Sequence, residues 1–535
     1  MPPTHVRTSK THPLKVDWLD LPGTERVGLT FAPGKKIGSA RGAPWDRDLD
    51  LDLDALVALE VGALVCLLED HELAAFGLRE LVPRAVARSI EVLRFPIPDG
   101  GVPHDLEAVE QLLAAIEERL IAGRRVVIHC MGGLGRTGTI AGCHLVRRGV
   151  APDEALAALR RVRDPDCPEN QRQRDFIARF AGRGVLPWLA NAKAARAADR
   201  REVRALVERV EAAVRAAPER CFQIDESGAA RLVAADRTYA AGRFEVPTLR
   251  ELRARVAARS KGGRVELTVL TGEHPMTDIG TLQATAPHGT VFQVASQFNC
   301  LEAPSARVVR VADYLDDPTQ GPRAAISAFP GALLRHYFAP AAPARGGRFV
   351  QSDARCLNLL EDVFDPSIAE VKSGYLQPHF IRDPEALARA LVERFDDVRV
   401  GVHDGVEVVF GHDWGGAVPE GRRIAQVLTS TIALGGYGRD GGSLGGARRQ
   451  LLRAAYLGTL LAAIDLGRED VVLTKIGGGV FGNPEGEIWD AIDWALGEVG
   501  PLVSGTLRVV VNSRSRVDET ARARVRARGG VIVER

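Results

Sequence analysis

One cysteine and one arginine stand at a spacing that suits chemistry on a phosphate group. Cys130 and Arg136 enclose a loop of five residues, which are Met131, Gly132, Gly133, Leu134 and Gly135. Glycines let backbone N–H groups turn inward as an anion-binding nest, and an arginine can place two N–H donors on phosphate oxygens. The pattern predicts a thiolate that attacks phosphorus while the loop and Arg136 hold the phosphate.

The flanking sequence supplies the elements that such a loop needs. Residues 126–128 form an apolar, β-branched run, which predicts a buried strand that ends at Cys130. Apolar residues at helical spacing follow, so a helix is expected to begin directly after the loop. Its N-terminal end adds positive potential, and a thiolate is stabilised there.

The run His-Cys-x5-Arg-Thr-Gly, residues 129–138, resembles the signature loop of the cysteine-dependent protein tyrosine and dual-specificity phosphatases. Its form CMGGLGR is most similar to the kinase-associated (cyclin-dependent kinase inhibitor 3-type) branch, as is WLDLPGTERVGLTFAPGKK at 18–36. The resemblance implies an α/β domain that hydrolyses a phosphomonoester in two steps, on a phosphorylated protein or a small molecule. The alternative is a buried structural cysteine beside an unrelated arginine.

The same resemblance implies roles for four further residues. A loop aspartate protonates the leaving oxygen in these phosphatases, and Asp99 in PIPDGGVP (96–103) is the candidate. Asp99 has an alternative role as a turn residue before Gly100. Gln173 is the candidate for orienting water, with Gln171 as an alternative. We expect His129 to hold the loop, and Thr137 to assist departure of the thiolate or to cap the helix.

Composition bounds the other functions. A chain of 535 residues with a net charge of +1 predicts two or three domains and argues against a nucleic acid or a membrane as partner. Its seven cysteines show no C-x2-C spacing, which argues against a zinc site and favours a reducing cytoplasm. No signal peptide or membrane span is visible. We expect no metal and no cofactor.

The pattern restarts in the second half of the chain, which sets the expected domain boundaries. Residues 1–15 are predicted to be a flexible lead and 16–187 the phosphatase domain. An Ala-, Arg- and Glu-rich stretch, 188–218, predicts a solvated helical linker. Strands and helices alternate again over 219–535, which predicts a second, three-layer α/β/α domain.

Glycine loops after strands in the second domain predict a phosphate-bearing ligand. Residues 473–484, LTKIGGGVFGNP, and the segment 319–326 resemble in order the two phosphate loops of a divergent macrodomain, the ADP-ribose-binding fold. The resemblance implies an ADP-ribose-type ligand. Its binding residues would be Asn299, Gln320, Gly321, Gly477, Gly478, Gly479, Val480, Phe481, Gly482 and Asn483.

Several interpretations of this domain stay open. The first loop reads TQGPR rather than a glycine-rich run with an aspartate, and either Glu273 or Asp278 would contact adenine. Asn299 could instead cap a helix, and the glycines could form a turn in an unrelated α/β domain. The domain could recognise ADP-ribosylated partners as a signalling adaptor. It could also hydrolyse an ADP-ribosyl bond, with the phosphatase acting on phosphorylated ADP-ribose.

Overall fold

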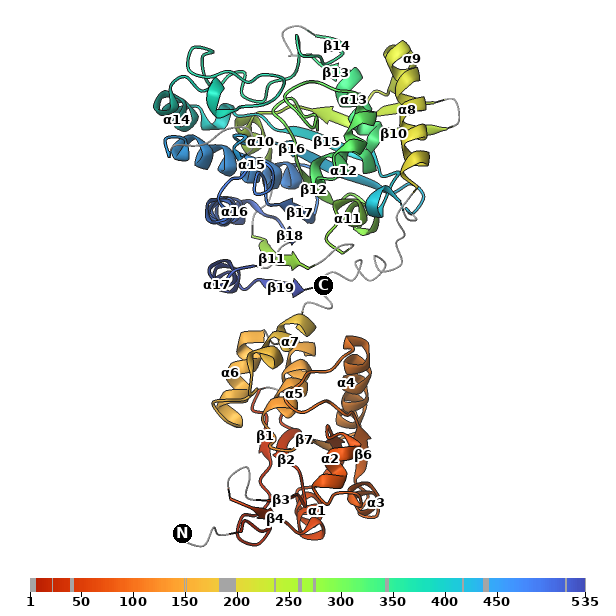
Figure 1. Ribbon diagram of the computed structural model, residues 1–535, viewed down its shortest axis with the longest axis vertical. Helices are drawn as coiled ribbons and strands as arrows, with labels where there is room; N and C mark the ends of the chain where they lie inside the picture. Colours follow the sequence, from red (N-terminus) through yellow and green to blue (C-terminus); the bar gives the residue numbers. More distant parts are fainter. Residues whose placement is uncertain are drawn as a thin grey trace. The chain divides into compact units, whose positions relative to one another are not determined.

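The computed structural model divides the chain into two compact units, residues 1–185 and 186–535. It describes residues 6–534 except 22, 39–42, 149, 151, 182–198, 235–236, 258–261, 273–275, 342–345, 416–417, 436–441 and 515–516. Both units are built from sheets flanked by helices (Figure 1), so the predicted α/β class is confirmed.

The first unit contains a five-stranded sheet in the order β1-β2-β7-β5-β6. β1 is antiparallel to β2, and the other neighbours are parallel. The strands are β1 (Asp17–Trp18), β2 (Val27–Phe31), β5 (Val61–Cys66), β6 (Glu91–Arg94) and β7 (Arg125–Cys130), with a hairpin of β3 (Lys36–Ile37) and β4 (Trp45–Asp46). The helices are α1 (Leu49–Ala58), α2 (Asp70–Ala75), α3 (Leu81–Val86), α4 (Leu106–Ile121), α5 (Gly135–Arg147), α6 (Pro152–Val162) and α7 (Gln171–Ala181).

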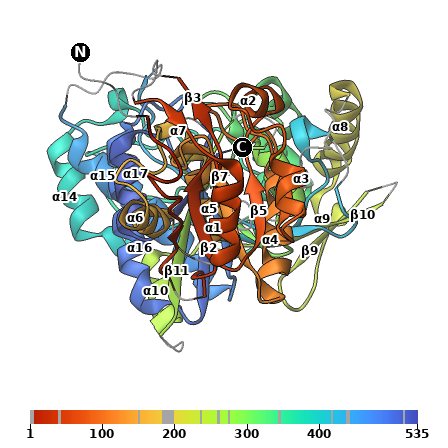
Figure 2. The same ribbon diagram turned by 90° about the horizontal axis from the view of Figure 1, so that it is seen from below.

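The central strand β7 is buried on both faces. Val126 and Ile128 pack into a core shared with α4–α7, whereas Val127 packs into the core shared with α1–α3. In Figure 2, β2, β7 and β5 lie side by side. A parallel strand that is buried on both faces is apolar along its length. This is why the apolar run 126–128 could be predicted as a strand from the sequence. The parallel strands end at one edge of the sheet, and β7 ends there at Cys130.

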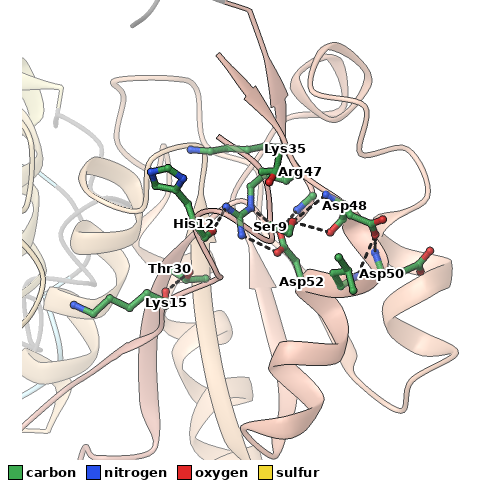
Figure 3. A network of polar contacts seen from close by, with 12 residues as sticks. Ser9, His12, Lys15, Thr30, Lys35, Arg47, Asp48, Asp50 and Asp52 are labelled. Atoms are coloured by element: carbon green, nitrogen blue, oxygen red, sulfur yellow. Dashed lines mark hydrogen bonds and ion pairs between the residues drawn. The ribbon is translucent and has the colours of Figure 1, made fainter. Parts of the chain in front are cut away.

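The segment 6–15, expected to be flexible, is bound to the first unit instead. Arg47 and Asp52 form a buried bidentate ion pair, with Nε–Oδ2 and Nη2–Oδ1 distances of 2.7 Å (Figure 3). Arg47 Nη1 also donates to the carbonyl of His12 at 2.6 Å, and Ser9 Oγ accepts from the N–H of Asp48 at 2.9 Å. A buried guanidinium needs its donors satisfied, so this pair fixes the N-terminal segment. Polar composition alone did not reveal that constraint.

The second unit is built on a ten-stranded sheet, in the order β19-β11-β18-β17-β12-β16-β15-β10-β9-β8. Its strands from β19 to β16 run parallel, and those from β15 to β8 run antiparallel. They are β8 (Phe222–Ile224), β9 (Ala230–Val233), β10 (Thr238–Glu245), β11 (Arg264–Thr271), β12 (Val291–Ala295), β15 (Gly401–Glu407), β16 (Arg423–Thr429), β17 (Asp470–Thr474), β18 (Thr506–Arg514) and β19 (Val531–Glu534). A small hairpin joins β13 (Ala339–Pro340) to β14 (Arg348–Phe349).

Helices cover both faces of this sheet (Figure 1). One layer holds α10 (Leu249–Ala257), α14 (Pro384–Glu393), α15 (Gly445–Asp465), α16 (Glu485–Val499) and α17 (Glu519–Ala527). The other holds α8 (Arg200–Ala216), α11 (Ile279–Thr285), α12 (Gln320–Ser327) and α13 (Phe329–Tyr337). Shorter elements are α9 (Pro218–Cys221), η3 (Val311–Asp316), η4 (Pro378–Phe380), η5 (Phe395–Asp397), η6 (His412–Trp414) and η8 (Gly500–Leu502).

The helix expected to be a solvated linker is part of the second unit. α8 buries a face formed by Val203, Val207, Val210 and Val214, four valines spaced at four-, three- and four-residue intervals. Glu211 on the same face is buried and accepts hydrogen bonds from the N–H groups of Val311 and Ala312, at 2.7 and 3.0 Å. It therefore satisfies the N-terminal N–H groups of η3. The balance of acidic and basic residues had suggested a solvated helix. It could not reveal that Glu211 is buried, because its backbone partners lie about 100 residues away in the sequence.

Two observations concern only the described part of the chain. None of its helices has the length and apolarity needed to cross a bilayer. No three His, Cys, Asp or Glu side chains within it are grouped so that they could hold a metal ion.

The buried ion pair predicts an asymmetry between two neighbouring aspartates. Asp52→Asn leaves Arg47 without its counter-charge and should destabilise the first unit by about 3–5 kcal/mol. Asp50 on the same helix pairs with Arg84 in an exposed bridge, so Asp50→Asn should cost less than about 1 kcal/mol. Hydrogen–deuterium exchange of peptides from β2, β5 and β7 measures both effects. Equal protection in the two variants would contradict the anchoring role of Asp52.

Candidate functional site

Cys130 lies at the carboxyl end of β7, and the loop after it opens helix α5. The thiol is buried, and the N–H of Gly133 donates to Sγ at 3.2 Å. The predicted order of strand, loop and helix is therefore present, with one backbone amide already on the sulfur.

The carbonyl groups of the loop are held from its outer side. The carbonyls that accept hydrogen bonds are those of Met131, Gly132, Gly133, Leu134 and Gly135. Lys35 Nζ donates to the carbonyl of Met131 at 3.1 Å. Arg163 donates through Nη2 to Gly132 at 3.1 Å and through Nε to Gly133 at 3.0 Å. A peptide group whose carbonyl points outward directs its N–H inward, so these contacts favour an amide nest around the sulfur.

Two glycines of the loop are required by close approach. Gly133 has φ +76°, and a Cβ there would lie 2.4 Å from the carbonyl oxygen of Thr30. A Cβ at Gly135 would lie 2.8 Å from the side-chain amide of Gln173. The chain thus packs β2 and α7 directly against the loop, and any larger residue at either position would displace it.

Arg136 is buried and fully engaged. Its Nη1 and Nη2 donate to the two carboxylate oxygens of Glu72 at 2.6 and 2.8 Å. Nη1 also donates to the carbonyl of Ile97 at 2.8 Å, and Nη2 to Asp99 Oδ1 at 3.0 Å. Burial by itself lowers the pKa of Arg136, but the hydrogen bonds to Glu72 and the nearby negative charges raise it above its ordinary value. Cys130 contributes one of those charges.

Glu72 is a site residue that the sequence analysis missed. It lies in the first turn of α2 and also accepts from the N–H of Glu69 at 2.9 Å, as the third helical residue of a capping box does. Burial raises the pKa of Glu72, yet the hydrogen bonds from Arg136 outweigh burial and lower it. The EDHEL sequence signals the cap, but nothing in it signals Arg136, which lies 64 residues away.

Asp99 lies in the loop after β6, with its side chain half exposed and its carboxylate on Arg136. The neighbouring backbone is tied to the start of α7. Asn170 Nδ2 donates to the carbonyl of Gly100 at 3.1 Å, and Gln173 Nε2 to that of Gly101 at 3.2 Å. These bonds place the Asp99 loop beside the loop after β7.

The remaining candidates occupy different positions. Gln173 is buried between the two loops, whereas Gln171 is exposed and bonds to Asp175 at 2.7 Å. His129 is buried, with Nδ1 3.2 Å from the carbonyl oxygen of Cys130. The hydroxyl of Thr137 is buried and has no hydrogen-bond partner among the described atoms. The structure therefore brings Gln173, His129 and Thr137 to the loop and separates Gln171 from it.

Lys35 approaches the loop through an aromatic enclosure. Its Nζ lies 4.8 Å from the ring centre of Phe31 and 4.7 Å from that of Trp45. Burial lowers the pKa of Lys35 to about 8, and the positive charge of Arg47 acts in the same direction, while the charge of Cys130 opposes them. The sequence GKK did not indicate the role of Lys35, because the carbonyl group that it binds lies 96 residues away.

The second unit contains a cavity of about 480 Å³. Residues at or just after the carboxyl ends of four parallel strands line it, including Ala295 (β12), Ser430 (β16), Thr474 (β17) and Ser513 (β18). Two further lining segments are 317–322 and 475–481. This edge of a parallel sheet is where α/β proteins bind ligands.

Seven of the predicted ligand residues line this cavity and three do not. Those that line it are Gln320, Gly321, Gly477, Gly478, Gly479, Val480 and Phe481. Asn299 lies outside its lining, and its amide is used by the backbone: Nδ2 donates to the carbonyl of Ser373 and Oδ1 accepts from the N–H of Leu301, both at 3.1 Å. Asn299 follows the end of a strand, and this position alone could not show whether its side chain contacts a ligand or stabilises a loop.

Gly482 and Asn483 shape the glycine loop rather than line the cavity. The N–H of Gly482 donates to the carbonyl of Gly479 at 3.0 Å. Asn483 Nδ2 donates to the carbonyls of Ile432 and Gly477, both at 3.2 Å. Asn483 therefore holds the loop between β17 and α16 against the segment after β16.

Of the two acidic candidates for an adenine contact, only Asp278 belongs to the described residues, and it does not line the cavity. Glu273 lies outside the described residues. Asp278 is buried, accepts from Arg323 Nη1 at 2.8 Å and caps α11 through the N–H of Thr281 at 3.1 Å. Among the described residues, two acids do line the cavity, Glu302 and Asp317, and the sequence analysis singled out neither. Glu302 lies in the segment CLEAP, which carries no motif.

Known proteins resemble parts of this chain. Residues 46–176 match a family model described as the DSP-PTPase phosphatase domain of a Swiss Army Knife protein. Cyclin-dependent kinase inhibitor 3 of Sus scrofa is 26% identical over 196 residues, which span 34% of this chain and 90% of that protein. Tyrosine-protein phosphatase CDC14 of Candida albicans is 35% identical over 77 residues, 14% of each chain.

Among solved structures, a poly(ADP-ribose) glycohydrolase from Thermomonospora curvata is similar over 61% of this chain and 99% of its own, with 18% identity and a TM-score of 0.33. The matched family model covers the loop that contains Cys130. The first unit therefore carries a phosphatase domain of the DSP-PTPase type, and the chain is a cysteine-dependent phosphatase.

Proposed function

We propose that the first unit hydrolyses phosphomonoesters through a phospho-cysteine at Cys130. In the first step an S–P bond forms, the P–O bond to the leaving group breaks, and Asp99 gives its proton to the leaving oxygen. In the second step water attacks phosphorus, Asp99 takes a proton from that water, and the S–P bond breaks. The substrate is a phosphorylated protein or a small phosphomonoester.

The contact that supports this proposal best is the one between Asp99 and Arg136. It joins the candidate acid to the side chain that would bind phosphate, and the Gly133 amide lies on the thiol of the same loop. Glu72 holds the guanidinium in one plane by two bonds. We expect a bound phosphate to exchange with Asp99 on Nη2, which turns the carboxyl toward the leaving oxygen. Arg136 and the loop amides then stabilise the charge that builds on phosphorus oxygens.

Cys130→Ser should reduce phosphate release from a generic aryl phosphate by at least about a thousandfold, because a hydroxyl is a far weaker nucleophile at neutral pH. Cys221→Ser in the second unit is the matched control and should keep full activity. Both are measured as kcat/KM on the full chain. Undiminished turnover by the Cys130 variant would end this assignment.

The support of the loop by Lys35 predicts a pH dependence. The pKa of Lys35 is lowered to about 8, so the ammonium loses its proton, and its bond to Met131 weakens, as the pH rises through that value. Wild-type kcat/KM should fall on the alkaline side near this pKa. Lys35→Met should be about tenfold less active at neutral pH and lack that alkaline limb.

The matched control for this substitution is Lys36→Met. Lys36 is exposed and pairs with Asp46 at 2.8 Å, so its loss should leave the rate and its pH profile unchanged. An alkaline limb that persists unaltered in Lys35→Met would show that another group titrates.

We propose in addition that the cavity of the second unit binds ADP-ribose or a related nucleotide. The glycine loop 477–479 lies at the strand ends, and Lys475 and Arg514 line the same cavity. Backbone amides and cations together suit a diphosphate. Two roles remain for such a site. The unit could recognise ADP-ribosylated partners as an adaptor, or it could hydrolyse the ADP-ribosyl bond while the phosphatase acts on phosphorylated ADP-ribose. Cleavage of an ADP-ribosyl bond by the protein would distinguish the second role from the first.

We also propose a cytoplasmic location, supported by seven unpaired cysteines.

Calorimetry with ADP-ribose on the full chain tests this second proposal. Gly477 has φ +69°, and a Cβ there would lie 2.4 Å from Asn483 Nδ2, so Gly477→Ala should weaken binding at least about tenfold by displacing the loop. Gly486→Ala is the control, because no atom lies within 4 Å of a Cβ at that position. Absence of heat with folded wild-type protein would count against an ADP-ribose ligand.

A further inference from the structure

Glu302 is a buried carboxyl group in the wall of the second cavity. Its residue is 2% exposed, and it lines the cavity together with Gly321 and Ala295. A Cβ at Gly321 would lie 2.2 Å from Glu302 Oε2 and 2.7 Å from the carbonyl oxygen of Ala295. The carboxyl therefore occupies the space that a side chain at 321 would take, which explains why the start of α12 has glycine there.

Charge around Glu302 does not favour an ionised carboxylate. Arg335 is the cation that acts on it, but its donors go elsewhere: Nε to the carbonyl of Cys300 at 3.1 Å and Nη1 to His403 Nδ1 at 2.8 Å and Gln426 Oε1 at 3.2 Å. Asp317 acts on Glu302 with the opposite effect.

Burial raises the pKa of Glu302 well above its ordinary value, the charge of Asp317 adds to the rise, and Arg335 only opposes it. Besides these groups, Tyr314 and Cys300 lie near enough to interact electrostatically with Glu302 or Arg335, and both stay protonated because burial raises their pKa values as well. Burial and the charge of Asp317 therefore both favour the protonated, neutral form of this carboxyl group.

One oxygen of this carboxyl is unsatisfied. Oε1 is buried and has no hydrogen-bond partner among the described atoms. A buried polar atom without a partner costs about 1–3 kcal/mol, and such atoms in native proteins call for an explanation. An apolar residue would fill the same wall without that cost, which points to a hydrogen-bonding role for the carboxyl group of this cavity-lining residue.

We propose that Glu302 is a ligand-binding residue that donates, as a neutral carboxylic acid, a hydrogen bond to an oxygen of the phosphate- or hydroxyl-bearing ligand in this cavity. The inference rests on the cavity's proposed function as a nucleotide site and adds a residue and a protonation state to it. The cavity also holds Lys475 and Arg514, which attract an anion. An ionised Glu302 would add to the negative charge of Asp317, which also lines the cavity, and would repel that anion, whereas the neutral acid does not.

The sign of the pH dependence follows from this state. The complex needs the protonated form, so affinity is complete below the pKa of Glu302 and falls by about tenfold for each pH unit above it. Lys475 is paired with Glu485 at 3.0 Å.

The test is calorimetry with ADP-ribose on the full chain from mildly acidic to mildly alkaline pH. Wild-type affinity should fall as the pH rises. Glu302→Gln, which keeps an N–H donor of similar size, should bind about as tightly as the acidic wild type at every pH. Glu302→Ala should bind about tenfold more weakly throughout. Glu420→Gln, an exposed residue outside the cavity lining, should match the wild type.

A second measurement separates this inference from the ligand assignment. Infrared difference spectra of wild type minus Glu302→Gln should show the C=O stretch of a protonated carboxyl group at neutral pH, with no ligand present. Without that band, or with wild-type affinity in Glu302→Ala, the inference is overturned. If the band is present but ADP-ribose gives no heat at any pH, the nucleotide assignment fails, whereas the protonated state inferred for Glu302 is upheld.

Discussion

The outward hydrogen bonds of the loop 130–136 are the constraint on which the first unit depends. Arg163 holds two consecutive carbonyls, and Lys35 holds the one before them. Because those oxygens are held on the outer side, the N–H groups already point toward the sulfur, and the loop loses no further conformational entropy when it binds an anion. Two cations behind the loop also favour negative charge in front of it. The buried pair of Arg47 and Asp52 supports this arrangement from beneath, because Arg47 lies over the same Phe31 and Trp45 rings as Lys35.

The sequence was most informative where chemistry is local. Cys130 and Arg136 belong to one short run, and the strand before them is apolar because it is buried on both faces. Glu72, Lys35 and Arg163 were missed for one shared reason. Each acts on the loop from a distant segment, and no local pattern distinguishes such an arginine or glutamate from a solvated one. The error over 6–15 has the same origin, since its anchor, Arg47, lies in another segment.

The second unit shows the complementary limit. The glycines 477–479 could be predicted as ligand-binding residues because a strand and a helix flank them, and they do line the cavity. Asn299 and Asn483 were predicted from the resemblance of their segments to a macrodomain, and in the structure both side chains hold backbone segments. Glu302 escaped notice because its significance comes from burial, an absent side chain at Gly321 and an engaged Arg335. None of these three features can be recognised from the residues next to Glu302 in the sequence. Polar residues at a strand end therefore identify the edge of the sheet that binds, but not the side chains that do it.

The central claim is that the sulfur of Cys130 becomes bonded to phosphorus during turnover. Rapid denaturing quench of the enzyme with excess aryl phosphate, followed by peptide mass spectrometry, measures this directly. The account predicts that the peptide containing Cys130 carries one phosphoryl group within the first turnover and that no other peptide does. A phosphoryl group on a different residue, or turnover with an unmodified Cys130 at every quench time, would contradict it.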